Sequence, residues 1–106
     1  MAKTYKIIYS QRSKDSLRRI YKLHLRLVGK NSAQKIVSDI KKSIGYLSDF
    51  PFISSEPRDE RLKELGLRLK ICGNYVCVYS VNDNIVEVEN IVDGRTDYIK
   101  RLLRDR

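Results

Sequence analysis

The sequence has few of the residues from which common catalytic centres are built. Its 106 residues include two cysteines, one methionine, one histidine and no tryptophan. A Ser-His-Asp triad or a Cys-His pair would have to use His24, which stands among Leu23, Leu25 and Leu27 on the predicted apolar side of a helix. We therefore expect His24 to be a packed structural residue rather than a catalytic one.

Metal ligands and phosphate-binding loops are equally scarce. Cys72 and Cys77 have no further cysteine or nearby histidine to complete a zinc site. One is predicted at a turn and the other inside a strand, so we expect two reduced thiols packed as small apolar groups. Neither a G-x-G-x-x-G motif nor a P-loop occurs. We expect no metal and no other cofactor.

Long hydrophobic runs are missing as well. The longest uncharged stretch, residues 71–82, falls short of the roughly 20 residues of a membrane span. The basic N-terminus, MAKTYK, has no apolar segment behind it and does not resemble a secretory signal. The length suits one domain over residues 1–106. We expect that domain to be cytoplasmic, without a membrane partner.

Positive charge is abundant and unevenly placed. The chain carries a formal net charge of +9, and residues 1–50 alone hold 12 Lys and Arg against 3 Asp and Glu. A local basic field favours a polyanion or an acidic protein as partner. The alternative is a solvated surface that only keeps the protein in solution.

The order of the predicted elements indicates an α+β fold. Residues 5–9 form a short strand, a helix begins at an N-cap Ser13 and ends at Gly29, and a second helix is capped by Asn31 or Ser32 and stops at Phe50-Pro51. A loop over 51–65 contains a helical turn at 59–65. Strands at 66–71, 75–81 and 85–92 and a short helix at 96–104 follow. We expect the order β-α-α-β-β-β-(α), with an antiparallel four-stranded sheet and an N-terminal helical hairpin packed on one face.

Alternation within the last strands predicts which side chains share a face. Leu67, Leu69 and Ile71 alternate with Arg68 and Lys70. The run at 75–81 is apolar on both phases, as in a central strand.

The final strand shows the same period of two. Val86, Val88 and Val92 alternate with Glu87 and Glu89. We expect the three valines to face the core together.

Four cations recur at every fourth position of the first helix: Lys14, Arg18, Lys22 and Arg26. This spacing stacks them along one ridge, which we call the basic ridge. Like charges at this spacing cost a few tenths of a kcal/mol each, so the ridge suggests a contact with a partner.

A second group of candidates lies around the sheet: Arg68, Lys70, Arg95 and Tyr98. Arginine and lysine can hold a phosphodiester and offset charge in its transition state, and a lysine or tyrosine can transfer a proton. The competing interpretation is structural, because Glu87 and Glu89 could pair with Arg68 and Lys70 across strands.

The chain resembles the RelE/ParE superfamily of toxins from bacterial type II toxin–antitoxin modules. The resemblance lies in YKIIYSQRSKDSLRRIY, in AQKIVSDIKKSIGYLSDFP and in GLRLKICGNYVCVYSVNDNIVEVENIVDGRTDY, which together span nearly the whole chain. It implies a cognate antitoxin whose segment wraps the toxin and keeps it inactive.

The resemblance implies one of two activities, of which we expect the first, with the second as the alternative. RelE-like members enter the ribosome and cut mRNA by attack of an RNA 2′-OH, without a metal. On that reading Arg68, Lys70, Arg95 and Tyr98 form the catalytic group of an endoribonuclease, and the basic ridge contacts RNA. ParE-like members inhibit DNA gyrase and are not nucleases. Val76 follows Tyr75 where RelE-like nucleases usually carry a catalytic arginine, which keeps the gyrase alternative open.

Overall fold

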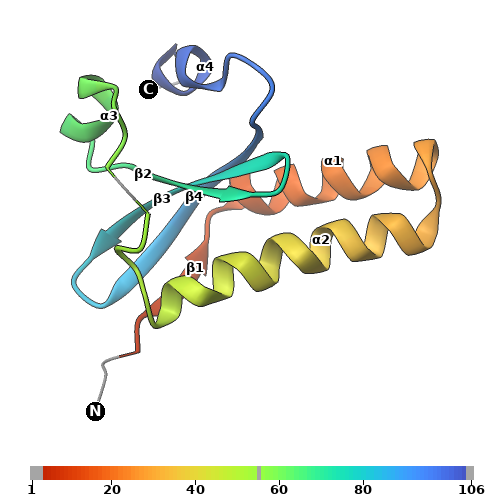
Figure 1. Ribbon diagram of the computed structural model, residues 1–106, viewed down its shortest axis with the longest axis horizontal. Coiled ribbons are helices and arrows are strands. Elements are labelled where there is room, and N and C mark those ends of the chain that lie inside the picture. The colour runs from red at the N-terminus through yellow and green to blue at the C-terminus, as the bar shows by residue number, and fades with distance from the viewer. Residues whose placement is uncertain (1–3, 55, 105–106) are drawn as a thin grey trace.

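The order of helices and strands confirms the α+β class. The computed structural model describes residues 4–54 and 56–104. Its elements are shown in Figure 1 and run in the order β1 (Lys6–Tyr9), α1 (Gln11–Leu27), α2 (Lys30–Gly45), η1 (Tyr46–Ser48), α3 (Glu60–Glu64), β2 (Arg68–Cys72), β3 (Tyr75–Asn82), β4 (Ile85–Asp93) and α4 (Tyr98–Arg104). Helices α1 and α2 form a long antiparallel pair whose far end projects beyond the sheet (Figure 1).

The four-stranded sheet is mixed, with strand order β1-β4-β3-β2. Strand β3 is antiparallel to both of its neighbours, as predicted. Strand β1, however, pairs in parallel with β4, with Lys6 opposite Ile85. The expectation of a wholly antiparallel sheet was therefore wrong at this pair. Tight turns dictate antiparallel pairing for β2, β3 and β4, but β1 reaches β4 only through tertiary packing of the helical hairpin.

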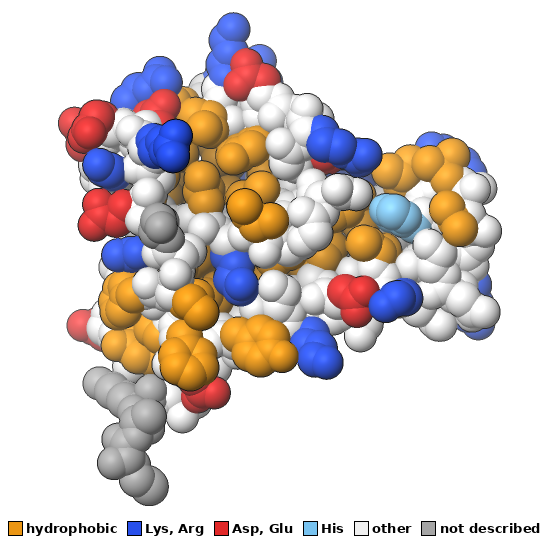
Figure 2. Space-filling view, viewed as in Figure 1, with side chains coloured by type: hydrophobic (Ala, Val, Ile, Leu, Met, Phe, Trp, Pro, Cys, Tyr) orange, Lys and Arg blue, Asp and Glu red, His pale blue; other side chains and the backbone are white. Residues whose placement is uncertain are grey.

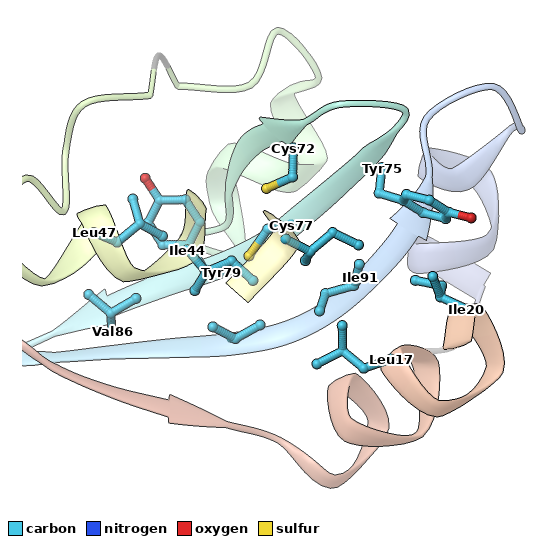
Figure 3. Close-up of a cluster of buried hydrophobic side chains, with 12 residues drawn as sticks. Leu17, Ile20, Ile44, Leu47, Cys72, Tyr75, Cys77, Tyr79, Val86 and Ile91 are labelled. Atoms are coloured by element: carbon cyan, nitrogen blue, oxygen red, sulfur yellow. The ribbon is translucent and has the colours of Figure 1, made fainter. Parts of the chain in front are cut away.

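The main core lies between the sheet and the α1–α2 pair. Figure 3 shows Leu17 and Ile20 from α1 beside Ile91 of β4, while Val86 lies at the other end of the cluster, on the side of Leu47 and Ile44. The cluster also draws on β2, β3 and η1, and its buried members are Leu17, Ile20, Ile40, Ile44, Leu47, Cys72, Tyr75, Cys77, Tyr79, Val86, Val88 and Ile91. Both cysteines are free and buried, as expected.

A smaller core covers the opposite face of the sheet. Leu62 of α3, Leu67, Val78 of β3 and Leu102 of α4 are its buried members, and Tyr98 packs against them. Strand β3 thus supplies both cores, since Cys77 and Tyr79 face α1 and α2 while Val78 faces α3 and α4. This two-sided burial confirms its prediction as the central strand.

A β-bulge in β4 changes which side chains share a face. Val78 lies opposite Asn90, but Tyr79 lies opposite Val88, so the register shifts at Glu89. Because of this extra residue, Val88 and Ile91 both enter the main core. Val92 packs against the smaller core instead. The prediction that Val86, Val88 and Val92 face one core was wrong for Val92.

Helix α1 begins earlier than predicted, at a Ser10 cap. The Ser10 Oγ accepts a hydrogen bond from the Ser13 N–H at 3.0 Å and donates to the Glu89 carbonyl at 2.7 Å. Ser13, the predicted cap, is instead fully buried inside the first turn, where its hydroxyl donates to the Ser10 carbonyl. The cap therefore ties the helix to the bulged part of β4.

The link between α1 and α2 is also shorter than predicted. Gly29 is the N-cap of α2 and has a φ of 140°, which an L side chain rarely adopts. Asn31 and Ser32, the predicted caps, lie inside the first turn of α2. This backbone conformation would be strained for any other residue, and at Gly29 it lets α2 follow α1 almost directly.

Replacing Ser10 by alanine tests the tie between the helix and the bulge. We expect Ser10→Ala to lower the free energy of unfolding by about 1–2 kcal/mol, because both bonds of the Ser10 hydroxyl are lost. Urea unfolding followed by circular dichroism measures the change. Ser32→Ala is the control and should shift stability by less than about 0.5 kcal/mol. Equal effects of the two substitutions would contradict the assigned cap.

Candidate functional site

Arg68 contacts two residues of the loop that follows η1. It lies opposite Tyr79, on the side of the sheet that faces the main core. Its Nη1 donates to the Ser54 carbonyl at 3.0 Å, and its guanidinium lies 4.9 Å from the centre of the Phe52 ring. Tyr79 fixes the same loop by donating to the Pro51 carbonyl at 2.8 Å. Arg68 therefore has structural partners, and it borders none of the cavities described below.

Lys70 and Tyr98 border a common groove along the outer strand β2. We call this hollow of about 490 Å³ the edge groove, and its lining residues are Ile53, Ser54, Glu56, Pro57, Arg58, Leu69, Lys70, Ile71, Val76 and Tyr98. Ile71 is 74% exposed there. Hydrophobic groups are visible on this face among the charged ones (Figure 2). The edge groove is mainly a surface for apolar contacts.

Arg95 is held by its neighbour Asp93 in the turn after β4. The Arg95 Nε and Nη2 donate to the two carboxylate oxygens of Asp93 at 3.0 and 2.9 Å. These hydrogen bonds keep the pKa of Asp93 below its usual 3.8. Gly94 between them is closely packed, since a Cβ there would lie 3.2 Å from the Asn74 carbonyl oxygen and from Val76, and these neighbours would have to shift slightly. The Arg95 side chain remains largely exposed and borders neither the edge groove nor the cleft described next.

A larger cleft lies where α1, the end of β4 and α4 meet. Its volume is about 620 Å³, and three of its lining residues are arginines that the sequence did not single out: Arg12, Arg19 and Arg101. We call it the arginine cleft. Tyr98 lines it as well as the edge groove, and Tyr75 and Ile20 contribute apolar surface.

The arginine cleft carries excess positive charge. Arg19 Nη2 donates to the Ser16 hydroxyl at 3.1 Å, and Arg101 Nη2 donates to the Thr96 hydroxyl at 3.0 Å, so neutral groups position both guanidiniums. The two carboxylates of the cleft, Asp15 and Asp93, form ion pairs with arginines outside it, Arg18 and Arg95. The cleft therefore favours an anionic partner.

The arginines of the cleft left only a weak signal in the sequence. Arg12 and Arg19 are seven residues apart, which places them on one side of α1. Arg101 follows Tyr98 by three residues on α4. That these two helices meet at one cleft depends on tertiary packing, which periodicity does not reveal.

The four predicted catalytic residues are thus not brought together. Tyr98 and Lys70 share the edge groove, while Arg68 contacts Phe52 and Arg95 contacts Asp93. The competing interpretation was that Arg68 and Lys70 pair with Glu87 and Glu89 across strands. Strand β3 lies between β2 and β4, so these residues are not on adjacent strands.

Two other side chains that could take part in catalysis, Cys77 and His24, are packed within the fold. Burial raises the pKa of the Cys77 thiol, so Cys77 is not a nucleophile at neutral pH. His24 is half-buried, and its Nε2 lies 3.2 Å from the Tyr75 hydroxyl. Within residues 4–54 and 56–104 no cluster of His, Cys, Asp and Glu is suited to a metal ion. In the same ranges no helix has both the length and the apolar character to cross a bilayer.

Comparisons with known proteins agree with this architecture. The chain matches the family described as ParE toxin of type II toxin-antitoxin system, parDE, over residues 7–98. It is similar to a chain of the chromosomal ParDE TA system from P. aeruginosa, with 17% identity, a TM-score of 0.73, and coverage of 85% of this chain and 96% of the other. A chain of the toxin–antitoxin complex RelBE2 from Mycobacterium tuberculosis gives 17% identity, a TM-score of 0.55, and coverage of 85% and 98%. No curated protein matches the sequence.

The fold is therefore that of the RelE/ParE superfamily of toxins. Within it, the chain belongs to the ParE toxin family of type II toxin–antitoxin systems, since the family match covers most of its length.

The Asp93–Arg95 contact can be tested by titration. We expect the Asp93 carboxyl to titrate below 3.8 and Arg95→Ala to raise its pKa toward that value. Because the folded pKa is lowered, the contact stabilises the fold above about pH 4 and is lost as the pH falls through the folded pKa. NMR of the side-chain carboxyl carbon between pH 7 and about 2 measures this. Arg61→Ala, which removes the partner of Asp59, is the control and should leave Asp93 unchanged.

Proposed function

We propose that this protein is the growth-inhibiting member of a toxin–antitoxin pair and acts as a binding inhibitor of DNA gyrase. It works in the cytoplasm and is kept inactive by a cognate antitoxin. The observation that carries this proposal is the separation of Arg68, Lys70, Arg95 and Tyr98, which share no single cleft. A nuclease needs its acid, base and phosphate-binding groups around one reacting phosphate. An inhibitor that acts by binding does not.

The surroundings of Val76 support the same proposal. Val76 is only 6% exposed and packs where Gly94 approaches the β2–β3 turn. RelE-like nucleases usually carry an arginine at this place, whereas Val76 presents an apolar side chain to the edge groove and offers no cation to a phosphate there. The chain also matches the ParE toxin family over residues 7–98. The resemblance to ParE-like toxins implies inhibition of gyrase, which supports the same proposal.

Two purified assays separate the alternatives. We expect the protein to block supercoiling of relaxed plasmid by gyrase in a dose-dependent manner and to leave mRNA on translating ribosomes intact. Mapping mRNA 5′ ends after induction in cells provides the matching test in vivo. Cuts within translated codons, together with uninhibited gyrase, would overturn the proposal.

A double substitution addresses the role of the candidate catalytic residues in cells. Lys70→Ala with Arg95→Ala should retain full growth arrest, because an inhibitor does not need them for chemistry. A nuclease that used both would lose activity by about 10²-fold or more, as expected when groups acting on a transition state are removed. Plating efficiency after induction reports the difference. Unfolding of the purified variant in urea serves as the control for stability.

The second candidate function is a ribosome-dependent mRNA endonuclease without a metal. One observation favours it, namely the arginine cleft, where Tyr98 and the guanidiniums of Arg19 and Arg101 could hold a phosphodiester. On this alternative Tyr98→Phe would abolish cleavage while leaving the smaller core packed. Retained growth arrest in Tyr98→Phe would exclude it.

A further inference from the structure

The solvent-facing side of α1 is cationic over most of its length. Within residues 11–22, the exposed side chains are those of Gln11 and of five cations, Arg12, Lys14, Arg18, Arg19 and Lys22. The aliphatic side chains of the same stretch, Leu17 and Ile20, are buried in the main core. Arg26 continues the positive charge one turn further. We call the basic ridge together with Arg12 and Arg19 the cationic face.

Little negative charge lies beside the cationic face. Asp15 is the one carboxylate in the sequence of α1. Its Oδ1 accepts hydrogen bonds from Arg18 at 2.8 Å and from the Gln11 amide at 3.0 Å. Within residues 4–54 and 56–104, the structure shows no ion pair for the other five cations of the face. Most of the charge of α1 is therefore available to a partner.

The positive charge extends onto both neighbours of α1. A hollow of about 550 Å³ between α1 and α2 is lined by three members of the basic ridge and by Lys41 of α2. Arg101 of α4 lines the arginine cleft together with Arg12 and Arg19. A partner that lies along α1 thus meets cations on the helix itself and on either side of it.

The pattern of these side chains favours a nucleic acid over a folded protein. The centre of a protein interface is depleted of charged residues and enriched in aromatic anchors, which the exposed positions of residues 11–22 lack. Cations four residues apart recur about every 6 Å along a helix. A DNA duplex carries one phosphate per about 1.7 Å of its axis, so each cation can meet a phosphate without a matched surface.

We propose that the cationic face of α1 binds the phosphate backbone of duplex DNA. The binding is independent of base sequence, because phosphate contacts carry no direct sequence information. In the gyrase complex this face contacts the DNA that the enzyme holds, and the protein binds gyrase with DNA more tightly than gyrase alone. That role in inhibition rests on the proposed function.

Fluorescence anisotropy with a labelled duplex tests the binding itself, and about 20 base pairs exceed the length of α1. We expect binding that is independent of base sequence and that weakens steeply with salt, because each phosphate contact releases counterions. Single-stranded RNA and oligoglutamate, which carry charge at lower density, should bind more weakly. Tighter binding of either one, or duplex binding that does not respond to salt, would overturn the proposal.

Matched neutral substitutions locate the binding surface. Lys14→Gln with Lys22→Gln should weaken duplex binding by about tenfold or more at about 0.1 M salt, and should reduce the slope of log K against log salt by about two. Arg58→Gln with Lys63→Gln removes equal charge at α3, which covers the opposite face of the sheet, and should leave the slope nearly unchanged. Circular dichroism confirms that both variants fold. Equal changes in the two variants would contradict the assignment to α1.

Gyrase assays with the same variants separate this inference from the proposed function. Half-inhibition of supercoiling should require about tenfold more of the Lys14→Gln/Lys22→Gln variant than of the Arg58→Gln/Lys63→Gln variant at about 0.1 M salt. Equal potency of the two variants would overturn the contact with gyrase-bound DNA. Failure of the unmodified protein to inhibit gyrase would instead contradict the proposed function, and the duplex-binding assay would still decide whether α1 binds DNA.

Discussion

The burial of β3 on both faces is the constraint on which the rest of this structure depends. Cys77 and Tyr79 anchor the sheet to the helical hairpin, while Val78 anchors α3 and α4 to the opposite side. Because neighbouring side chains of one strand point to opposite faces, the two cores are separated by the thickness of a single sheet. Each candidate site therefore lies on one face of the sheet or at one of its edges.

The sequence predicted the parts of the fold that local patterns specify. Local patterns sufficed for the helical hairpin, for the strands joined by tight turns and for the short α3, since apolar periodicity and turn residues specify them. The parallel pairing of β1 with β4 involves residues about 80 positions apart, beyond the reach of any local signal. The bulge at Glu89 was equally hidden, because an unbroken alternation predicts an unbroken face for Val92.

The site was harder to predict than the fold, for a related reason. Charge and residue type identified Arg68 and Arg95, yet both have structural partners. Phe52, the partner of Arg68, is distant in the sequence, whereas Asp93 stands two residues before Arg95. Arg12, Arg19 and Arg101 become one group only when α4 returns beside α1. The basic ridge could be predicted from spacing alone, since its members belong to one helix. The hollow beside three of them also needs Tyr9 of β1 and Val37 of α2, which only the fold brings there.

The position of Tyr98 affects two cavities, the arginine cleft and the edge groove. Tyr98 stands at the start of α4 and lies in the walls of the arginine cleft and of the edge groove at once. The two hollows consequently share one wall. Any occupant that displaces α4 to enlarge one of them reshapes the other in the same event, so binding at the two places is thermodynamically linked even though no ligand touches both.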